Sequence, residues 1–263
     1  MPRFKVYLEY LGTRYSGWQI QKNARSVQGE IRQGIQRSEG IGDFELYGAG
    51  RTDAGVHALA QVAHLDIETG LDAQQLRRRI NAELPSDIHI LKIEPADRRF
   101  HARHHAVGRS YLYQISRRRT AFGKKLVWWI REDLDLARMR EAGALFVGMK
   151  NYRSFTAEEP GEKSTRVLID RVELRETGDL ILIRVEGSHF LWGMVRRIVG
   201  VIAEAGRGNL SLKEIAGFLR VKSDKPARLA APASGLFLER VYYEGDARLA
   251  QLEPVLRITT PAL

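Results

Sequence analysis

Short segments of alternating apolar and polar residues follow one another along this chain, separated by segments in which apolar residues recur at helical spacing. Alternation with a period of two is typical of strands with one buried face. It predicts strands over residues 4–10, 44–47, 56–67, 88–93, 109–116, 166–174, 180–185 and 236–243. Apolar residues three and four positions apart predict helices. Two helices are predicted to begin after Ser26 and Asp72, and a third to run from Asp133 or Asp135 to Phe146. Two more are predicted over residues 190–205 and 212–219.

Local end signals agree with these helices. Ser26 and Asp72 are residue types preferred at helix N-caps, and Gln75 stands three positions after Asp72, as a capping box requires. Pro85 predicts the end of the helix that follows Asp72. Gly206 is a suitable C-cap for the longest apolar helix of the second half.

The order of elements repeats once along the chain. Each half opens on an alternating strand with closely spaced tyrosines, Tyr7 and Tyr10 in the first half and Tyr111 and Tyr113 in the second. This repetition predicts an α+β protein whose two similar α/β halves share one central sheet, antiparallel or mixed and mostly antiparallel in our preferred interpretation, with flanking helices. The predicted divisions are an N-terminal half over 1–104, a C-terminal half over 105–246 and a C-terminal extension over 247–263.

Composition then narrows the class of partner. The chain of 263 residues has 42 Lys and Arg against 32 Asp and Glu, a formal charge of +10. Such an excess predicts a polyanionic partner, with solubility alone as the alternative. The absence of cysteine excludes disulfides and cysteine-ligated metal centres, and suits a cytoplasmic protein. The sequence shows neither a signal peptide nor an apolar run of about 18 residues for a membrane span.

Two clusters of basic residues are candidates for contact with nucleic acid. Residues 98–125 contain nine Lys and Arg and no acidic residue, and residues 77–79 are three arginines. A solvated charged face is the alternative for each cluster, but the acid-free window favours contacts to phosphate. Tyr111 and Tyr113 share one strand face, where each ring either stacks on a base or packs on the sheet. The residues predicted to contact RNA are Arg77, Arg78, Arg103, Arg109, Arg117 and Arg118.

A single carboxylate lies in the glycine-rich loop GRTDAGVH, residues 50–57. Its glycines permit tight turns and the close approach of a ligand. Arg51 favours the ionised form of Asp53, which can then act as a nucleophile or a base. A polar turn with a surface ion pair is the alternative. Arg196 flanks the apolar stripe of a helix in the second half, and an arginine turned inward there needs an anion such as Asp53 or a phosphate.

Other chemistries find less support in the sequence. His101, His104 and His105 suggest a metal site, but no Asp, Glu or Cys stands nearby at ligand spacing. The chain has no GxxxxGK[ST] loop, no GxGxxG after a strand and no GxSxG elbow. We therefore expect neither a metal nor a nucleotide cofactor. A magnesium-dependent nuclease using Asp53 and Asp66 is an alternative that lacks a further acidic cluster.

Several motifs occur in a fixed order along the chain besides the Asp53 loop. They are Tyr10-x-Gly12-Thr13-x-Tyr15-x-Gly17-Trp18-Gln19, Ser26-Val27-Gln28, Leu84-Pro85-x-Asp87-Ile88, Phe100-His101-Ala102-Arg103, Arg109-x-Tyr111-x-Tyr113, Phe190-Leu191-x-x-Met194-Val195-Arg196-x-Ile198-Val199-Gly200 and Ala231-Pro232-Ala233-x-Gly235-Leu236. Together these motifs span about residues 4–243 and resemble those of the tRNA pseudouridine synthase A family. One departure is Tyr152, which stands where many bacterial members have an acidic residue.

The resemblance implies a cofactor-independent isomerase that converts uridine to pseudouridine in the anticodon stem-loop of tRNA, at positions 38, 39 and 40. It implies the pseudouridine synthase fold, a duplicated ferredoxin-like arrangement with its cleft between the halves, and a homodimer that binds tRNA across both subunits. A non-catalytic RNA-binding or RNA-folding protein on the same scaffold is the alternative.

The resemblance also implies a role for each site residue. Asp53 is then the catalytic carboxylate that acts on a flipped-out base. Tyr111 would stack on the uracil, and Arg51 would fill the gap left by the base. Arg196 would pair with Asp53, and Leu236 would press on the base from the other side.

Overall fold

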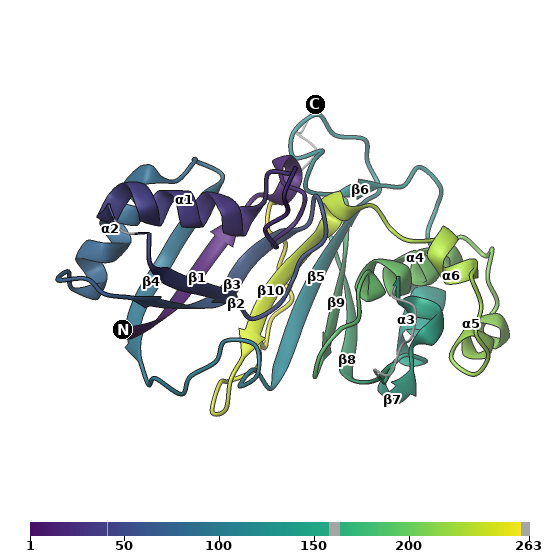
Figure 1. The fold of residues 1–263 in the computed structure, drawn as a ribbon. Helices are drawn as coiled ribbons and strands as arrows, with labels where there is room; N and C mark the ends of the chain where they lie inside the picture. The colour runs from purple at the N-terminus through teal and green to yellow at the C-terminus, as the bar shows by residue number, and fades with distance from the viewer. Residues whose placement is uncertain (41, 158–163, 259–263) are drawn as a thin grey trace. The chain divides into compact units, whose positions relative to one another are not determined.

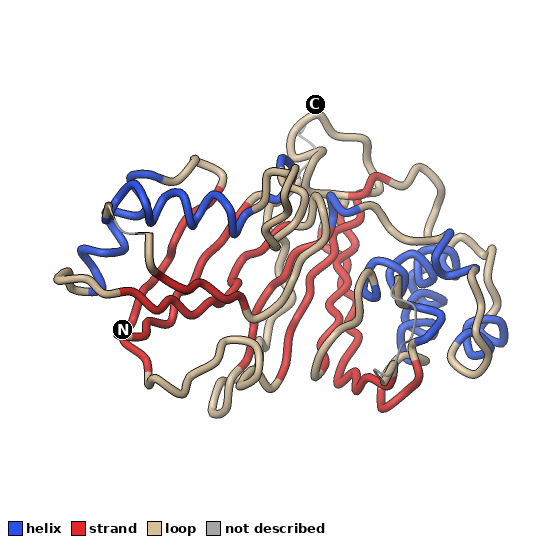
Figure 2. The backbone as a smooth tube through the Cα atoms, viewed as in Figure 1, coloured by secondary structure: helices blue, strands red, loops and turns tan. Residues whose placement is uncertain are grey.

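The computed structural model describes residues 1–40, 42–157 and 164–258. The chain folds into two compact units, drawn in Figures 1 and 2. Unit 1 consists of Met1–Val107 and Phe237–Asp246, and unit 2 of Gly108–Leu236 and Ala247–Leu263. The domain divisions expected from the sequence, at 104/105 and 246/247, stay a prediction.

Unit 1 has a sheet in the order β4-β1-β3-β10, with β2 also paired to β3. All its strand pairs are antiparallel except that of β10 with β3, which is parallel. Two helices pack with this sheet, and Asn81 joins the second to β4 by hydrogen bonds to both backbone groups of Ile90. The elements are β1 Arg3–Tyr10, α1 Val27–Glu39, β2 Phe44–Gly48, β3 His57–Ile67, α2 Ala73–Glu83, β4 Ile88–Ala96 and β10 Leu236–Tyr242.

Unit 2 has an antiparallel sheet in the order β5-β9-β8-β7, with the short β6 parallel to β5. Its strands are β5 Gly108–Ser116, β6 Trp128–Trp129, β7 Gly148–Asn151, β8 Arg166–Thr177 and β9 Leu180–Gly187. Its helices are α3 Leu136–Ala144, α4 Met194–Gly206, α5 Leu212–Phe218 and α6 Lys225–Arg228. The described part of the chain also has three short 3-10 helices, Gly12–Arg14 in unit 1 and Arg153–Phe155 and Ala233–Gly235 in unit 2.

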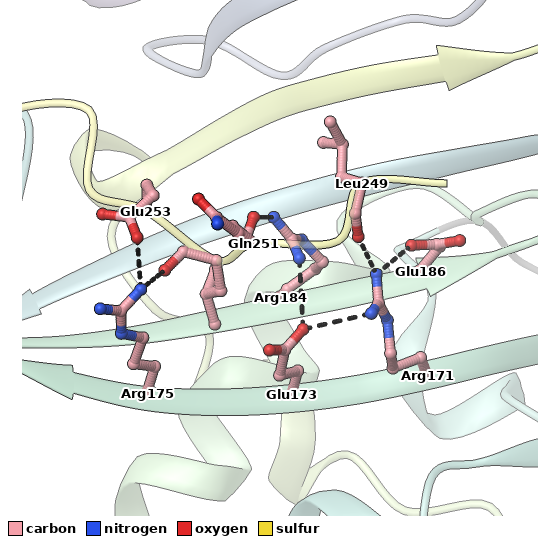
Figure 3. A network of polar contacts seen from close by, with 9 residues as sticks. Arg171, Glu173, Arg175, Arg184, Glu186, Leu249, Gln251 and Glu253 are labelled. Carbon is pink, nitrogen blue, oxygen red and sulfur yellow. Dashed lines mark hydrogen bonds and ion pairs between the residues drawn. The ribbon is translucent and has the colours of Figure 1, made fainter. Parts of the chain in front are cut away.

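The two faces of the unit 2 sheet are covered differently. Val172 and Leu174 face α3, where a Cβ on Gly143 would lie 3.0 Å from the Val172 side chain. Their neighbours along β8 point to the opposite face and meet the chain that follows β10. There the buried Arg184 donates to the Gln251 carbonyl at 2.6 Å and pairs with Glu173 at 3.2 Å. Figure 3 shows this network between the strands and the C-terminal segment.

The C-terminal extension is therefore part of unit 2 as far as it is described. Arg171 and Arg175 donate to the carbonyls of Leu249 and Leu252, and Gln114 accepts the backbone N–H of Val255. No periodicity in residues 247–258 predicts this packing, because most of these bonds use backbone carbonyls of the segment. Residues 259–263 of the predicted extension lie outside the described residues.

Most predicted elements are confirmed within a few residues, and so is the α+β mixture of sheet and helix. Ser26 accepts the N–H of Gly29 at the start of α1, and Asp72 and Gln75 form the predicted capping box of α2. One prediction is wrong at both ends: the helix expected over 190–205 begins at Met194, after Gly193 at φ 69°, and Gly206 is its last helical residue rather than its cap. No helix of the described residues is long and apolar enough to cross a membrane.

Candidate active site

Asp53 lies on the connection from β2 to β3, in unit 1. Its side chain is half-buried, and it stands directly before a turn at Ala54–Gly55. The N–H of Val56 donates to the Asp53 carbonyl at 3.1 Å and closes this turn. Gly55 has φ 78°, a conformation that side chains other than glycine rarely adopt. The loop sequence therefore fixes the backbone that carries the carboxylate.

A second segment of unit 1 holds the Asp53 loop from outside. The N–H of Trp18 donates to the Thr52 carbonyl at 3.1 Å, and the N–H of Gly55 donates to the Tyr15 carbonyl at 3.2 Å. The Tyr10 and Thr52 hydroxyls share a buried hydrogen bond of 2.8 Å. Residues on both sides of Asp53 are thus tied to the chain between β1 and α1, which is the motif segment Tyr10 to Gln19.

Two glycines of that motif are required by this close approach. A Cβ on Gly12 would lie 1.9 Å from the Val56 carbonyl oxygen, and one on Gly17 would lie 2.4 Å from the Thr52 carbonyl oxygen. The Gly12 N–H instead donates to Nδ1 of the buried His57, at 2.9 Å. The two backbones can pack this closely only because both positions lack a side chain.

Arg51, in the same loop, is exposed. The residue before it is held, since Gln61 donates to the Gly50 carbonyl at 3.0 Å. The cation therefore extends from an anchored stretch of backbone into solvent, and a ligand can reach it. Asp53 and Arg51 are the predicted site residues that unit 1 supplies.

Unit 2 supplies Tyr111 and Tyr113, which lie opposite Val185 and Ile183 of β9 on the face of the sheet that meets the helices. Tyr113 is fully buried, burial raises the pKa of its phenol, and its hydroxyl donates to the Pro232 carbonyl at 2.8 Å. Tyr111 is half-buried and meets the Phe190 ring edge-on at 5.0 Å between centroids. Of the two rings, Tyr113 packs in the core and Tyr111 keeps an accessible surface.

Arg196 and Leu236 are joined through the segment 231–236 of unit 2. Arg196 Nε donates to the Ala231 carbonyl at 2.7 Å, and the Ala231 N–H donates back to the Arg196 carbonyl at 2.9 Å. Gly235 rests on the Tyr113 ring, where a Cβ would lie 2.7 Å from ring atoms. These contacts place Leu236, which is buried, at the start of β10. Unit 2 thus links Tyr113, next to Tyr111 on the same strand face, with Arg196 and Leu236.

The six arginines expected to contact RNA differ in their surroundings. Arg78 and Arg103 are exposed, Arg77 is half-buried on α2, and Arg109 donates to the Ser188 carbonyl at 2.9 Å. Arg117 and Arg118 form ion pairs of 2.5 and 3.0 Å with Glu176 and Asp179 of the β8–β9 hairpin. Contact of these six side chains with RNA stays a prediction. For Arg117 and Arg118 to contact phosphate, their ion pairs with the hairpin must break, or each arginine must bind its carboxylate and a phosphate at once.

The carboxylate needed by the nuclease alternative is engaged elsewhere. Asp66 accepts two hydrogen bonds from Arg3, at 2.6 and 2.5 Å, and this partner lowers the pKa of Asp66. Within the described ranges, no group of three or more His, Cys, Asp or Glu side chains is arranged to hold a metal ion. His101 Nδ1 accepts the backbone N–H groups of Arg103 and His104, at 3.2 and 3.3 Å, and so stabilises its own turn.

Comparison with known proteins matches the segments that contain the candidate residues Asp53, Arg196 and Leu236. A family model described as tRNA pseudouridine synthase matches residues 7–105 and 142–244. The chain belongs to the tRNA pseudouridine synthase family. The predicted family, its fold class and its enzyme class, an isomerase, are thereby confirmed.

Individual relatives in this family cover nearly the whole chain, and each is named tRNA pseudouridine synthase A. The protein of Afipia carboxidovorans is 37% identical over 246 residues, 92% of this chain and 100% of the relative. That of Geobacillus kaustophilus is 36% identical over 252 residues, 95% and 98%. That of Brucella ovis is 38% identical over 248 residues, 92% and 98%. Among solved structures, the archaeal box H/ACA sRNP Nop10–Cbf5 complex aligns at a TM-score of 0.40 and 12% identity, over 86% of this chain and 58% of that chain.

Tyr152, the departure from the family pattern, is a core residue of unit 2. Its ring is fully buried against Phe146 and Phe155, and its hydroxyl donates to the Phe146 carbonyl at 2.5 Å. Burial raises the pKa of this phenol. A phenol whose one hydroxyl is hydrogen-bonded therefore fits this buried position.

Proposed function

We propose that this protein isomerises uridine to pseudouridine in the anticodon stem-loop of tRNA, at positions 38, 39 and/or 40, with Asp53 as the catalytic carboxylate. The observation that carries the assignment is the Asp53 loop, whose backbone is hydrogen-bonded on both sides to the motif segment Tyr10 to Gln19. A surface turn with an incidental ion pair has no need of two glycines at backbone contact distance. The relatives named tRNA pseudouridine synthase A support tRNA as the substrate.

The reaction exchanges one bond for another and needs no external atom. The bond between N1 of uracil and C1′ of the ribose breaks, the base turns, and C5 bonds to C1′. The proton on C5 is then lost and a proton is gained at N1. An ionised carboxylate suits the first step, because it can attack or deprotonate as the glycosidic bond breaks.

The remaining predicted residues handle the extruded base. A base taken out of a stem loses stacking and pairing worth a few kcal/mol, which phosphate contacts must offset. Tyr111, half-buried and braced by Phe190, offers a ring for the uracil. Arg51 fills the vacated stack, Arg196 holds Asp53 ionised, and Leu236 closes the pocket from its anchored position at the start of β10. Exclusion of water keeps the detached base from escaping.

The proposal also includes a homodimer acting in the cytoplasm without metal or nucleotide cofactor. A non-catalytic RNA-binding or RNA-folding protein on this scaffold is the second candidate. It would bind tRNA through the same basic surface and leave every uridine unchanged.

Replacement of Asp53 tests the proposal. Asp53→Asn keeps the shape of the side chain and removes its charge, so turnover should fall by about 10²–10⁴-fold or more. The assay incubates unmodified tRNA transcripts with enzyme and maps pseudouridine by position, and a filter-binding measurement checks that affinity for tRNA persists.

The exposed Asp133 of unit 2 provides the matched control, since Asp133→Asn makes the same chemical change on the surface. It should leave turnover unchanged. Turnover of Asp53→Asn within about tenfold of wild type would remove Asp53 from the mechanism. Wild-type protein that binds tRNA and forms no pseudouridine would favour the second candidate.

A further inference from the structure

The loop from β5 to β6 in unit 2 exposes a large aromatic side chain. Phe122 is 88% exposed, more than any other large apolar side chain given for the described residues. We define the aromatic loop as residues 117–125, and its place is the connection that enters β6 in Figure 1. A single exposed ring is common on protein surfaces, so the surroundings of Phe122 decide whether it can serve a partner.

The aromatic loop is held by its own hydrogen bonds. Thr120 Oγ1 donates to the Phe122 carbonyl at 2.8 Å, and the Leu126 N–H donates to the Gly123 carbonyl at 2.8 Å. At the loop's base, the Ser116 hydroxyl donates to the Arg118 carbonyl at 2.7 Å. Phe122 is therefore presented on a defined turn, and its exposure does not come from lack of local structure.

Basic residues flank Phe122 along the chain, and acidic residues are absent from this stretch. The chain from Arg117 to Arg131 contains no Asp or Glu. Arg119 and Lys124 are exposed within the loop, and the Arg119 guanidinium lies 5.7 Å from the Trp129 ring, which is 42% exposed. Among described residues, neither cation has an ion pair, whereas Arg117 and Arg118 are paired with the β8–β9 hairpin. An aromatic ring flanked by unpaired cations is the combination that stacks on a base while neutralising phosphates.

We propose that the aromatic loop is an auxiliary RNA-binding element in which Phe122 stacks on an unstacked base of the tRNA, outside the uridine site, while Arg119 and Lys124 contact the adjoining phosphates. This inference rests on the proposed function in taking tRNA as the ligand. A second copy of the chain is the weaker occupant, because a chain of formal charge +10 repels a copy of itself at a basic surface.

Three substitutions at Phe122 separate stacking from other apolar contact. Phe122→Ala should raise the dissociation constant for an unmodified tRNA transcript by about fivefold to a hundredfold, as loss of a stacked base predicts. Phe122→Trp should bind like the wild type, and Phe122→Leu should bind like Phe122→Ala, because it keeps apolar surface and loses the ring. Since the side chain is 88% exposed, none of the three disturbs the core. Val221→Ala, at another exposed apolar position of unit 2, is the control and should not change binding.

A charge substitution tests the phosphate contacts independently. Lys124→Gln should reduce the slope of log affinity against log salt by about one, and Arg119→Gln should do the same. With tRNA at saturation, single-turnover pseudouridine formation by Phe122→Ala should equal the wild-type rate, because Phe122 does not take part in the chemistry.

The outcomes distinguish this inference from the proposed function. Unchanged affinity and salt slope in Phe122→Ala and Lys124→Gln would overturn the aromatic loop as an RNA-binding element, even if the wild type makes pseudouridine. Wild-type affinity of Phe122→Leu would overturn stacking. A change of sedimentation in Phe122→Ala with unchanged tRNA binding would assign the ring to a protein contact instead. Absence of pseudouridine in the wild type would defeat the proposed function alone, since the binding measurements do not use turnover.

Discussion

Gly17 is required by two independent properties of its position. Its φ is +92°, and a Cβ there would lie 2.4 Å from the Thr52 carbonyl oxygen, next to Asp53. Gly17→Ala should lower the free energy of unfolding by about 1–3 kcal/mol. It should also lower turnover by up to about 10²-fold, because the backbone that positions Asp53 must shift.

Gly50 provides the control for that substitution in the Asp53 loop itself. A Cβ on Gly50 would have no neighbour within 4 Å. Gly50→Ala should therefore keep the stability and activity of the wild type. Chemical denaturation and pseudouridine formation measured on both variants decide the matter, and equal effects at the two positions would contradict the steric argument.

His64 is a residue whose charge state should make stability depend on pH. It is buried, its Nδ1 accepts the Ala102 N–H at 3.2 Å, and the Tyr47 ring stacks on it at 5.3 Å. Burial first, then the positive charges of Arg3 and His101, lower the pKa of His64 to about 4, while Asp66 opposes them. The folded protein thus keeps this imidazole neutral where the unfolded chain binds a proton.

The sign of the effect follows from linkage. Below about pH 6.5, the ordinary pKa of histidine, His64 binds a proton in the unfolded chain but stays neutral in the folded protein. The free energy of unfolding should therefore fall as the pH drops from about 6.5 toward 4. The loss should be on the order of 1–3 kcal/mol. Urea denaturation at several pH values measures it, and His64→Gln, which keeps an acceptor and cannot titrate in this range, should flatten the curve. A variant curve parallel to the wild type would exclude His64 as the cause.

At the scale of elements, local sequence signals predicted helices well where a side chain acts on the adjacent backbone. Ser26, Asp72 and Gln75 could be recognised because an N-cap and its partner lie within one turn of helix. The start of α4 was missed because Phe190 and Leu191 continue the apolar pattern, while Gly193 breaks the helix by its positive φ. Periodicity depends only on which residues are apolar, so it does not show that the backbone of a glycine has a positive φ.

The C-terminal segment could not be predicted for a related reason. Its attachment to β8 and β9 depends on carbonyls of residues 249–252, and a carbonyl is common to all residues. What the sequence does contain is the other half of the network, the alternating charges Arg171, Glu173 and Arg175 on one face of a strand. These charges and the fully buried Arg184 of β9 are explained by the C-terminal segment that covers them (Figure 3).

This network gives a prediction for the stability of unit 2. Arg184 is fully buried and holds both Glu173 and the Gln251 carbonyl. Arg184→Ala would take the donor from the Gln251 carbonyl and leave Glu173 with Arg171, at 3.4 Å, as its ion-pair partner. The free energy of unfolding should fall by about 2–4 kcal/mol. Arg175→Ala removes an arginine from the same network that is 46% exposed, and should cost less than about 1 kcal/mol. Similar losses in the two variants, measured by thermal or urea denaturation, would contradict the role given to burial.

At the scale of the whole molecule, the sequence motifs predicted the family and the candidate residues, and the structure adds how each residue is held within its unit. In the sequence, Gly12, Gly17 and Gly235 are recognisable only as members of motifs. In the structure, a Cβ at each of them would collide with another segment of the chain. Such contacts join residues more than 30 positions apart, which no local pattern records. The buried and accessible roles of Tyr113 and Tyr111 were equally unresolved, because two residues two apart on a strand share a face.

The balance of charge over the whole chain gives the last prediction. Many basic residues are neutralised internally, as Arg3 is by Asp66 and Arg117 by Glu176, so the formal surplus of +10 is the charge left for a polyanion. Binding of tRNA that neutralises several phosphates releases counterions, and its affinity should fall by at least about 10²-fold between about 50 and 200 mM salt. Filter binding of a tRNA transcript over that range measures the slope. Turnover at saturating tRNA should change far less, because the proposed mechanism breaks the glycosidic bond after the base is enclosed and water excluded. A flat binding curve would mean that the basic clusters do not contact phosphate, and would leave the excess charge to solubility alone.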